Sequence, residues 1–349
     1  MVNISLLKKI CEVPGAPGFE QRIREFVLQE VAPLVDEVTV DTMGSIIALK
    51  KGKTPKKVMV AAHLDEISFI VTHIDDDGFL RIHTLGGFDA KTLTAQRVIV
   101  HGKKDLIGVM GSKPIHIMKQ EERNKPPQIQ DYFVDLGMSK AQVEEVVSVG
   151  DPITREREMI EIGDCVNGKS IDNRVSVYML IEALKELQGQ ELPYDLYAVF
   201  TVQEEVGIRG AISATHRIDP DFGIALDTTI AFDVPSAQPH EMITKLGYGA
   251  AIKIMDSGVI SDYRMVNFLK ELAKKHNVKW QPEILTGGAT DAYGMQRSGK
   301  SGAITGAISI PTRHIHSVIE MVHKEDIRNC IELLKYSVLE LDQYDWGFR

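Results

Sequence analysis

The stretch KVMVAAHL, residues 57–64, decides the fold. Its side chains are mainly apolar or small, two of them (Val58 and Val60) are β-branched, and they do not alternate with polar ones. This pattern is typical of a strand buried on both faces, as in a parallel or mixed sheet covered by helices. His63 lies at the end of this strand, and Asp65 follows two residues later. Two side chains suited to chemistry are therefore expected at the end of a core strand.

Similar apolar runs recur along the chain, separated by stretches whose apolar residues have helical spacing. Strands are predicted at 45–49, 196–202, 222–226 and 303–310, and helices at 5–13, 20–35, 173–187, 262–276 and 324–341. Strands that alternate with helices form layered α/β structures around a largely parallel sheet. We therefore predict an α/β domain.

Between about residues 70 and 163 the pattern changes. Short alternating strands are broken by turn sequences such as DDDG at 75–78, which is typical of a small β-rich unit. A loop is predicted at 119–130, and a helix at 139–147, where the pattern S-x-x-Q marks an N-terminus. The chain is thus predicted to have a discontinuous α/β domain, 1–70 plus 164–349, and an inserted β-rich domain, 71–163.

Composition argues against two classes of main partner. Lys plus Arg is 40 and Asp plus Glu is 49, so the formal charge is −9, which disfavours nucleic acid or an anionic membrane surface. No run of 18 apolar residues is present. The three cysteines, Cys11, Cys165 and Cys330, are far apart and do not form a disulfide pattern. We expect a cytoplasmic protein.

Acidic and imidazole side chains follow several predicted strands. His63 and Asp65 end one strand, Glu204 and Glu205 another, and Asp227 a third. In open α/β sheets, ligands bind at the carboxyl ends of strands. Two further groups are candidates: Asp172, in a turn that opens a helix, and a histidine in TRHIHS at 312–317, either His314 or His316.

These groups suit a pair of divalent metal ions, because zinc takes imidazole nitrogen and carboxylate oxygen. Five groups can serve two sites if one carboxylate bridges them and water completes each shell. Two ions would polarise a carbonyl and lower the pKa of a water molecule. Of Glu204 and Glu205, one would bind metal and the other would act as general base. Asp65 could accept the free N–H of His63 and so fix its tautomer.

At these residues the chain resembles the glutamyl and tetrahedral aminopeptidases, a family of co-catalytic metallopeptidases. The matching segments occur in the family's order: PGAPGFE (14–20), VAAHLDEISFIV (60–71), GKSIDNRV (168–175), VQEEVGIRGA (202–211), ALDTT (225–229), GGATDA (287–292) and IPTRHIHS (310–317). The resemblance implies a zinc-peptidase-like α/β/α sandwich with an inserted β-barrel-like domain. It also implies removal of N-terminal residues from peptides.

The resemblance assigns roles to individual residues. It implies that Asp172 bridges two metal ions, that His63 and Asp227 complete one site, and that Glu205 and His316 complete the other. It makes Glu204 the general base and Asp65 the residue that orients His63. Zinc or cobalt is the expected metal, and manganese also suits these ligands. The peptide bond after the bridging aspartate is cis in related enzymes.

Assembly is also implied by the resemblance. Many members form dimers through the inserted domain, and these dimers build a twelve-subunit tetrahedral shell that admits short or unfolded peptides. We therefore expect a homo-oligomer that acts on short peptides. At Asn173 and His314 the chain differs from the acidic residue and the tyrosine usual in the family, but every ligand position is kept.

Other functions share parts of this pattern. A carboxypeptidase or an N-acyl amino acid deacylase on the same fold could use the same metal ligands. A glucanase would instead need two carboxylates across a sugar and no metal pair. A catalytically inactive binding protein would have no use for a general base at Glu204.

Overall fold

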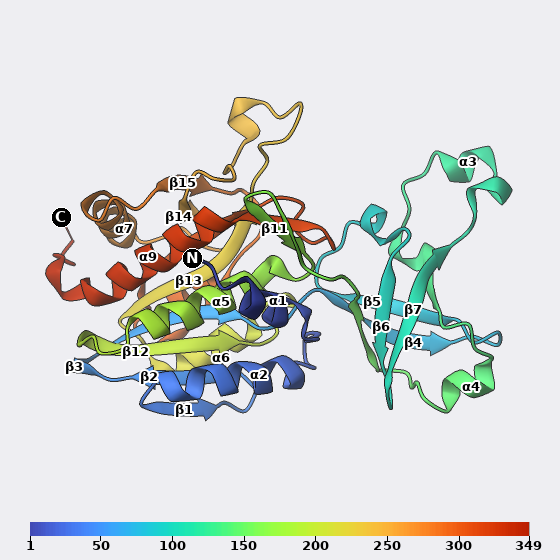
Figure 1. The fold of residues 1–349 in the computed structure, drawn as a ribbon, viewed down its shortest axis with the longest axis horizontal. Coiled ribbons are helices and arrows are strands. Elements are labelled where there is room, and N and C mark those ends of the chain that lie inside the picture. Colours follow the sequence, from blue (N-terminus) through green and yellow to red (C-terminus); the bar gives the residue numbers. More distant parts are fainter. Residues whose placement is uncertain (349) are drawn as a thin grey trace.

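An eight-stranded mixed sheet forms the centre of the protein in the computed structural model, which describes residues 1–348 (Figure 1). Four parallel neighbours lie in its middle: β12 (Leu192–Thr201), β3 (Gly52–His63), β13 (Phe222–Ile230) and β16 (Ile304–Thr312). The order continues on one side with β2 (Ile46–Lys50) and β1 (Glu37–Val40), and on the other with β14 (Ala250–Met255) and β15 (Trp280–Ile284). The expected strands are therefore confirmed, although β3 and β12 begin earlier than the predicted residues 57 and 196, and β13 ends later than the predicted residue 226.

Helices cover both faces of this sheet, which explains the unbroken apolar character of residues 57–64. Val58, Val60 and Ala62 pack into one core, whereas Met59 and Ala61 pack into another on the opposite face. The first face carries α1 (Ile4–Glu12), α2 (Gln21–Val31), α5 (Ile171–Glu186), α7 (Tyr263–Lys275) and α9 (Lys324–Leu339). The second carries α6 (Arg209–Ile218) and α8 (Asp291–Ser298), neither of which was among the predicted helices.

A closed six-stranded barrel lies beside the sheet, at the right of Figure 1. Its own core includes the buried side chains of Phe69, Val98 and Val134. The short helices α3 (Gln120–Arg123) and α4 (Lys140–Glu144) accompany it, so the predicted loop at 119–130 contains one helical turn. The helix-covered sheet and this barrel together confirm the predicted fold class, an α/β fold with an inserted β-barrel-like domain. Around the barrel the strands are β4 (Ser68–Ile74), β5 (Leu80–Leu85), β8 (Tyr132–Asp135), β7 (Asp105–Ser112), β6 (Arg97–His101) and β9 (Pro152–Arg155).

A small three-stranded sheet includes β11 (Cys165–Gly168), which Figure 1 shows between the barrel and the eight-stranded sheet. It pairs β10 (Ile160–Ile162), β11 and β17 (Glu320–His323), all antiparallel. This pairing brings residues just after His316 next to residues just before Asp172, although the two ligand candidates are far apart in sequence.

Two absences complete the description of residues 1–348. Cys11, Cys165 and Cys330 are free, as expected. None of the described helices combines the length and the apolar character that crossing a membrane requires.

Candidate metal centre

The predicted site residues meet at the carboxyl ends of the four parallel strands. His63 ends β3, and Glu204 and Glu205 lie in the turn after β12. Asp227 lies within β13, three residues before its end, rather than closing the strand as predicted. His316 lies between β16 and β17. Asp172 is in the first turn of α5, where Asp172 and Asn173 have non-helical backbone angles and are joined by a cis peptide bond.

Asp172 stands between the two imidazoles. Its Oδ1 lies 3.3 Å from Nε2 of His63, and its Oδ2 lies 3.3 Å from Nε2 of His316. Nε2 of His63 is also 3.9 Å from Oδ1 of Asp227, and Nε2 of His316 is 3.6 Å from Oε2 of Glu205. Two groups of three ligand atoms therefore share Asp172: one with His63 and Asp227, the other with Glu205 and His316.

The donor set fits metal ions. Ligand atoms about 2.0–2.1 Å from a tetrahedral zinc ion lie roughly 3.3 Å from one another. Each carboxylate oxygen of Asp172 lies at this distance, 3.3 Å, from the Nε2 atom of the imidazole that it faces. Oδ1 of Asp172 and Oε1 of Glu205 are buried and have no hydrogen-bond partner among residues 1–348. A buried carboxylate oxygen normally has a partner, and a bound cation would provide one for these two oxygens. His314, the alternative to His316, is exposed and belongs to neither group.

The electrostatics of the cluster also favour cations. Burial raises the pKa of Glu204 well above its usual value, and the neighbouring Asp227 and Glu205 add to the effect. Burial, together with Asp172, raises the pKa of Glu205 to about 8, and burial likewise raises the pKa of Asp227. So many carboxylates can remain ionised together only when positive charge lies among them.

Asp65 contacts both halves of the cluster. Nδ1 of His63 lies 3.1 Å from the carbonyl oxygen of Asp65 and 3.5 Å from its carboxylate Oδ1. A proton on Nδ1 would leave the Nε2 lone pair free for a metal. The Asp65 carboxylate itself accepts the backbone N–H groups of Glu204, at 3.0 Å, and Glu205, at 3.1 Å. The main chain that carries both glutamates is thus held by Asp65.

Sequence reasoning did not single out Glu320, which is fully buried beside the cluster. Its carboxylate accepts the backbone N–H of Asp172 at 2.9 Å and that of His316 at 2.8 Å. The signal in the sequence is an acidic residue inside the otherwise apolar run VIEMV, 318–322. Such a residue is expected either to be exposed on an edge or to satisfy buried donors.

A cavity of about 500 Å³ opens onto the cluster. His63, Asp172, Glu204, Glu205, Asp227 and His316 all line it. Its other lining residues include Thr228–Ile230, Leu285, Ala289, Lys253 and Asp256. Lys253 is buried and pairs with Glu283, and Asp256 lies 3.5 Å from its ammonium group. The metal cluster therefore borders a cavity whose other lining residues include both apolar and charged side chains.

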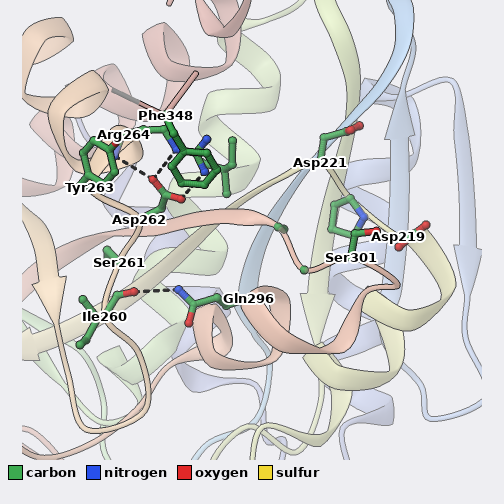
Figure 2. A pocket seen from close by; sticks show the side chains of 14 residues that line it. Asp219, Asp221, Ile260, Ser261, Asp262, Tyr263, Arg264, Gln296, Ser301 and Phe348 are labelled. Atoms are coloured by element: carbon green, nitrogen blue, oxygen red, sulfur yellow. Dashed lines mark hydrogen bonds and ion pairs between the residues drawn. The ribbon is translucent and has the colours of Figure 1, made fainter. Parts of the chain in front are cut away.

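A second hollow, of about 770 Å³, lies at the opposite ends of β13 and β16 (Figure 2). There Asp262 pairs with Arg264, and the Ile260 carbonyl accepts a hydrogen bond from Gln296. No histidine lines this hollow among residues 1–348. It therefore lacks the donor set that marks the first cavity.

Comparison with known proteins agrees with the fold and the site. A family model described as M42 glutamyl aminopeptidase matches residues 44–333. The lysyl aminopeptidase of Pyrococcus furiosus is 36% identical over 361 residues, which cover 99% of both chains. The structure of a TET aminopeptidase from a marine sediment Thaumarchaeota archaeon has a TM-score of 0.94 at 36% identity, covering 97% of this chain and 96% of that one.

A further structural relative is the TET1 peptidase of Pyrococcus horikoshii, with a TM-score of 0.87 and 32% identity, covering 97% of this chain and 99% of that one. The resemblance seen in the sequence segments is thus confirmed over nearly the whole length. The chain belongs to the M42 glutamyl aminopeptidases, a family of peptide hydrolases.

Proposed function

We propose that this aminopeptidase works with two divalent metal ions that share Asp172. His63 and Asp227 would complete one site, and Glu205 and His316 the other. The observation that carries the proposal is the position of Asp172, whose two carboxylate oxygens each face a different imidazole at 3.3 Å. Zinc, cobalt and manganese all suit these ligands.

The two ions, when bound, would polarise the carbonyl of the scissile peptide bond and lower the pKa of a water molecule. Glu204 is the proposed general base. It lines the cavity, its carboxylate lies 3.8 Å from Nε2 of His63, and it belongs to neither group of metal ligands. It would take the proton of the attacking water and then deliver it to the leaving amine.

Asp65 is the proposed positioning residue for this step. Its backbone carbonyl and carboxylate lie beside Nδ1 of His63, and its carboxylate holds the backbone of Glu204 and Glu205. The same residue would thus orient one metal ligand and hold the backbone of the proposed base in place.

A homo-oligomer is part of the proposal. The TET1 peptidase of Pyrococcus horikoshii can assemble into a tetrahedron or a large octahedral shell. In this chain the outer face of barrel strand β7 exposes Ile107 and Val109, and the following segment exposes Ile115 and Ile117. A cluster of exposed apolar side chains is typical of a surface that packs against another protein. We propose that barrel contacts build dimers and that larger shells restrict the substrate to short peptides.

Hydrolysis of aminoacyl-nitroanilides and of N-acetyl amino acids, each with and without a chelator, tests the function. We expect cleavage of the free-amine substrates only, and none in the presence of the chelator. Cleavage confined to N-acetyl amino acids would instead favour a deacylase. Chelator-insensitive cleavage of cellulose would favour a glucanase, which needs no metal pair.

A further inference from the structure

Glu320, the first residue of β17, joins two of the proposed metal ligands through their main chain. Its Oε2 accepts the N–H of Asp172 at 2.9 Å, and its Oε1 accepts the N–H of His316 at 2.8 Å. We propose that Glu320 is a positioning residue that sets the separation of Asp172 and His316, and thereby the affinity for the metal ion between them. This inference rests on the proposed two-metal function.

Both N–H groups lack a regular partner of their own. Asp172 is in the first turn of α5, where backbone N–H groups have no carbonyl of the same helix to bond. His316 has a φ of +60°, in the left-handed region that a non-glycine residue adopts only when its surroundings hold it there. One carboxylate therefore satisfies two donors, the buried N–H of Asp172 and the part-buried N–H of His316.

Glu320 is itself held from two sides. Its strand pairs with β11, where Gly168 is its direct partner, four residues before Asp172. The side chain of Asn167 donates to the carbonyl oxygens of Ile319, at 2.7 Å, and Glu320, at 3.0 Å. The next residue, Met321, exchanges backbone hydrogen bonds with Arg313, three residues before His316. Glu320 is thus fixed relative to both segments that it joins.

The arrangement repeats what Asp65 does on the other side of the cluster. There a buried carboxylate accepts the N–H groups of Glu204 and Glu205. In both places a carboxylate outside the proposed ligand set holds the backbone of site residues: the ligands Asp172 and His316 for Glu320, and the proposed base Glu204 and the ligand Glu205 for Asp65. Ligands held in this way keep their separation before any ion binds, so less order has to be gained on binding.

A purely structural role for Glu320 makes a different prediction. Loss of two buried hydrogen bonds would then destabilise the protein with and without metal to the same extent, and metal affinity would not change. A positioning role requires the affinity itself to fall. The test therefore measures metal binding as well as stability and activity.

The experiment compares Glu320→Gln with Glu325→Gln, a matched control at an exposed glutamate five residues later. The amide has one acceptor oxygen instead of two and turns an NH₂ group toward a backbone N–H. The metal-free proteins are titrated with zinc against a chromophoric chelator, the cobalt-loaded proteins are compared by visible absorption, and the metal-free proteins are unfolded thermally.

We expect Glu320→Gln to bind one of its two zinc ions roughly 10–100-fold more weakly and to show an altered cobalt spectrum. Glu325→Gln should match the parent protein in both measurements. If Glu320→Gln does not fold, Glu320→Asp serves in its place, because its shorter carboxylate cannot reach both N–H groups.

Unchanged zinc affinity and an unchanged cobalt spectrum in the variant that folds would overturn the inference, even if its metal-free form melted earlier. Failure of the parent protein to bind two ions would instead show that the two-metal proposal itself is wrong.

Discussion

The carboxylate of Asp65 accepts the backbone N–H of Glu204 at 3.0 Å, so the backbone of the proposed base is held by a residue 139 positions earlier in the chain. Asp65 is fully buried, and its second oxygen takes the next N–H, that of Glu205. The turn begins at Gln203, whose φ of +55° lies in the left-handed region. The base and one metal ligand are thus placed by a turn that depends on a carboxylate outside it.

Replacement of Asp65 by asparagine should weaken both stability and turnover. The amide keeps one acceptor but places an NH₂ group against one of the two backbone donors, which costs about 1–3 kcal/mol in a buried position. We also expect kcat/KM to fall roughly 10–100-fold, because the glutamates move. Urea unfolding and nitroanilide kinetics measure the two effects. Asp77→Asn, at an exposed position, is the control; equal behaviour of the two variants would remove Asp65 from the site.

Replacement of Glu204 by glutamine should separate catalysis from metal binding. The amide cannot accept a proton, so kcat should fall by roughly 10²–10⁴. Because Glu204 belongs to neither group of ligands, the content of bound metal should stay the same. Metal analysis and steady-state kinetics on the same preparation test both halves. A variant that kept full activity would refute the assignment of the base. Glu144→Gln, the same substitution at an exposed position on the barrel side, is the control and should behave like the parent protein.

Removal of metal should abolish hydrolysis and lower the melting temperature. In the metal-free protein several carboxylates are buried close together, and burial together with the neighbouring carboxylates raises the pKa values of Glu204, Glu205 and Asp227. An ion present at a thousandfold excess over its Kd stabilises the folded state by about 4 kcal/mol. Calorimetry with and without a chelator, followed by addition of zinc, cobalt or manganese, checks this. Full activity in protein shown to be free of metal would contradict it.

The stability of the metal-free protein should fall as pH rises because of Glu20. This buried carboxyl accepts the N–H groups of Gly18 and Gln203, and burial together with the charge of Asp65 raises its pKa from 4.5 to about 7. A folded-state pKa above the unfolded one means that the stabilisation is complete below pH 4.5 and is lost as pH rises through 7.

The full effect is at most about 3 kcal/mol. Glu20→Gln cannot ionise, so its free energy of unfolding should lose less than that of the parent protein between pH 5 and pH 8. Urea unfolding at the two pH values measures the difference, with the exposed Glu25→Gln as control. The same pH slope in the parent protein and Glu20→Gln would show that Glu20 does not titrate in this range.

Charged residues on the barrel should break the assembly. Ile107 and Ile117 are exposed in a single chain, and burial of such side chains between copies would stabilise a dimer. Ile107→Glu with Ile117→Glu should therefore sediment as a smaller particle than the parent protein, while the nitroanilide activity persists. Val40→Glu, on edge strand β1, is the control. An unchanged sedimentation coefficient would exclude this face of the barrel from the assembly.

The central strands and most of the cluster could be predicted because both follow from simple patterns. Apolar runs without alternation marked strands buried on two faces, and the polar residues at their ends fell on one edge of the sheet. The geometry then separated alternatives that chemistry left open: His316 joins the cluster whereas His314 is exposed, and Glu205, not Glu204, lies in a group of ligand atoms.

The remaining differences arise where a tertiary contact or a single local residue overrides the apolar pattern. Strands β14 and β15 contain Lys253 and Glu283, which are acceptable in buried strands only because they pair with each other. Helix α2 ends before the predicted residue 35, because Pro33 lies in the tight turn Ala32–Leu34 that follows it. Glu320 looks like an ordinary strand residue until the donors that it meets are known.

The spread of the proposed ligands along the chain governs when the enzyme can first act. His63 is the first of the proposed ligands along the chain and His316 is the last, so the ligand set is incomplete until residue 316 has been synthesised. A product truncated before residue 316 would remain inert for the same reason. A copy that lacks His316 therefore lacks one of the proposed metal ligands, and the proposed centre can form only after β3, β12, β13 and β16 have all been made.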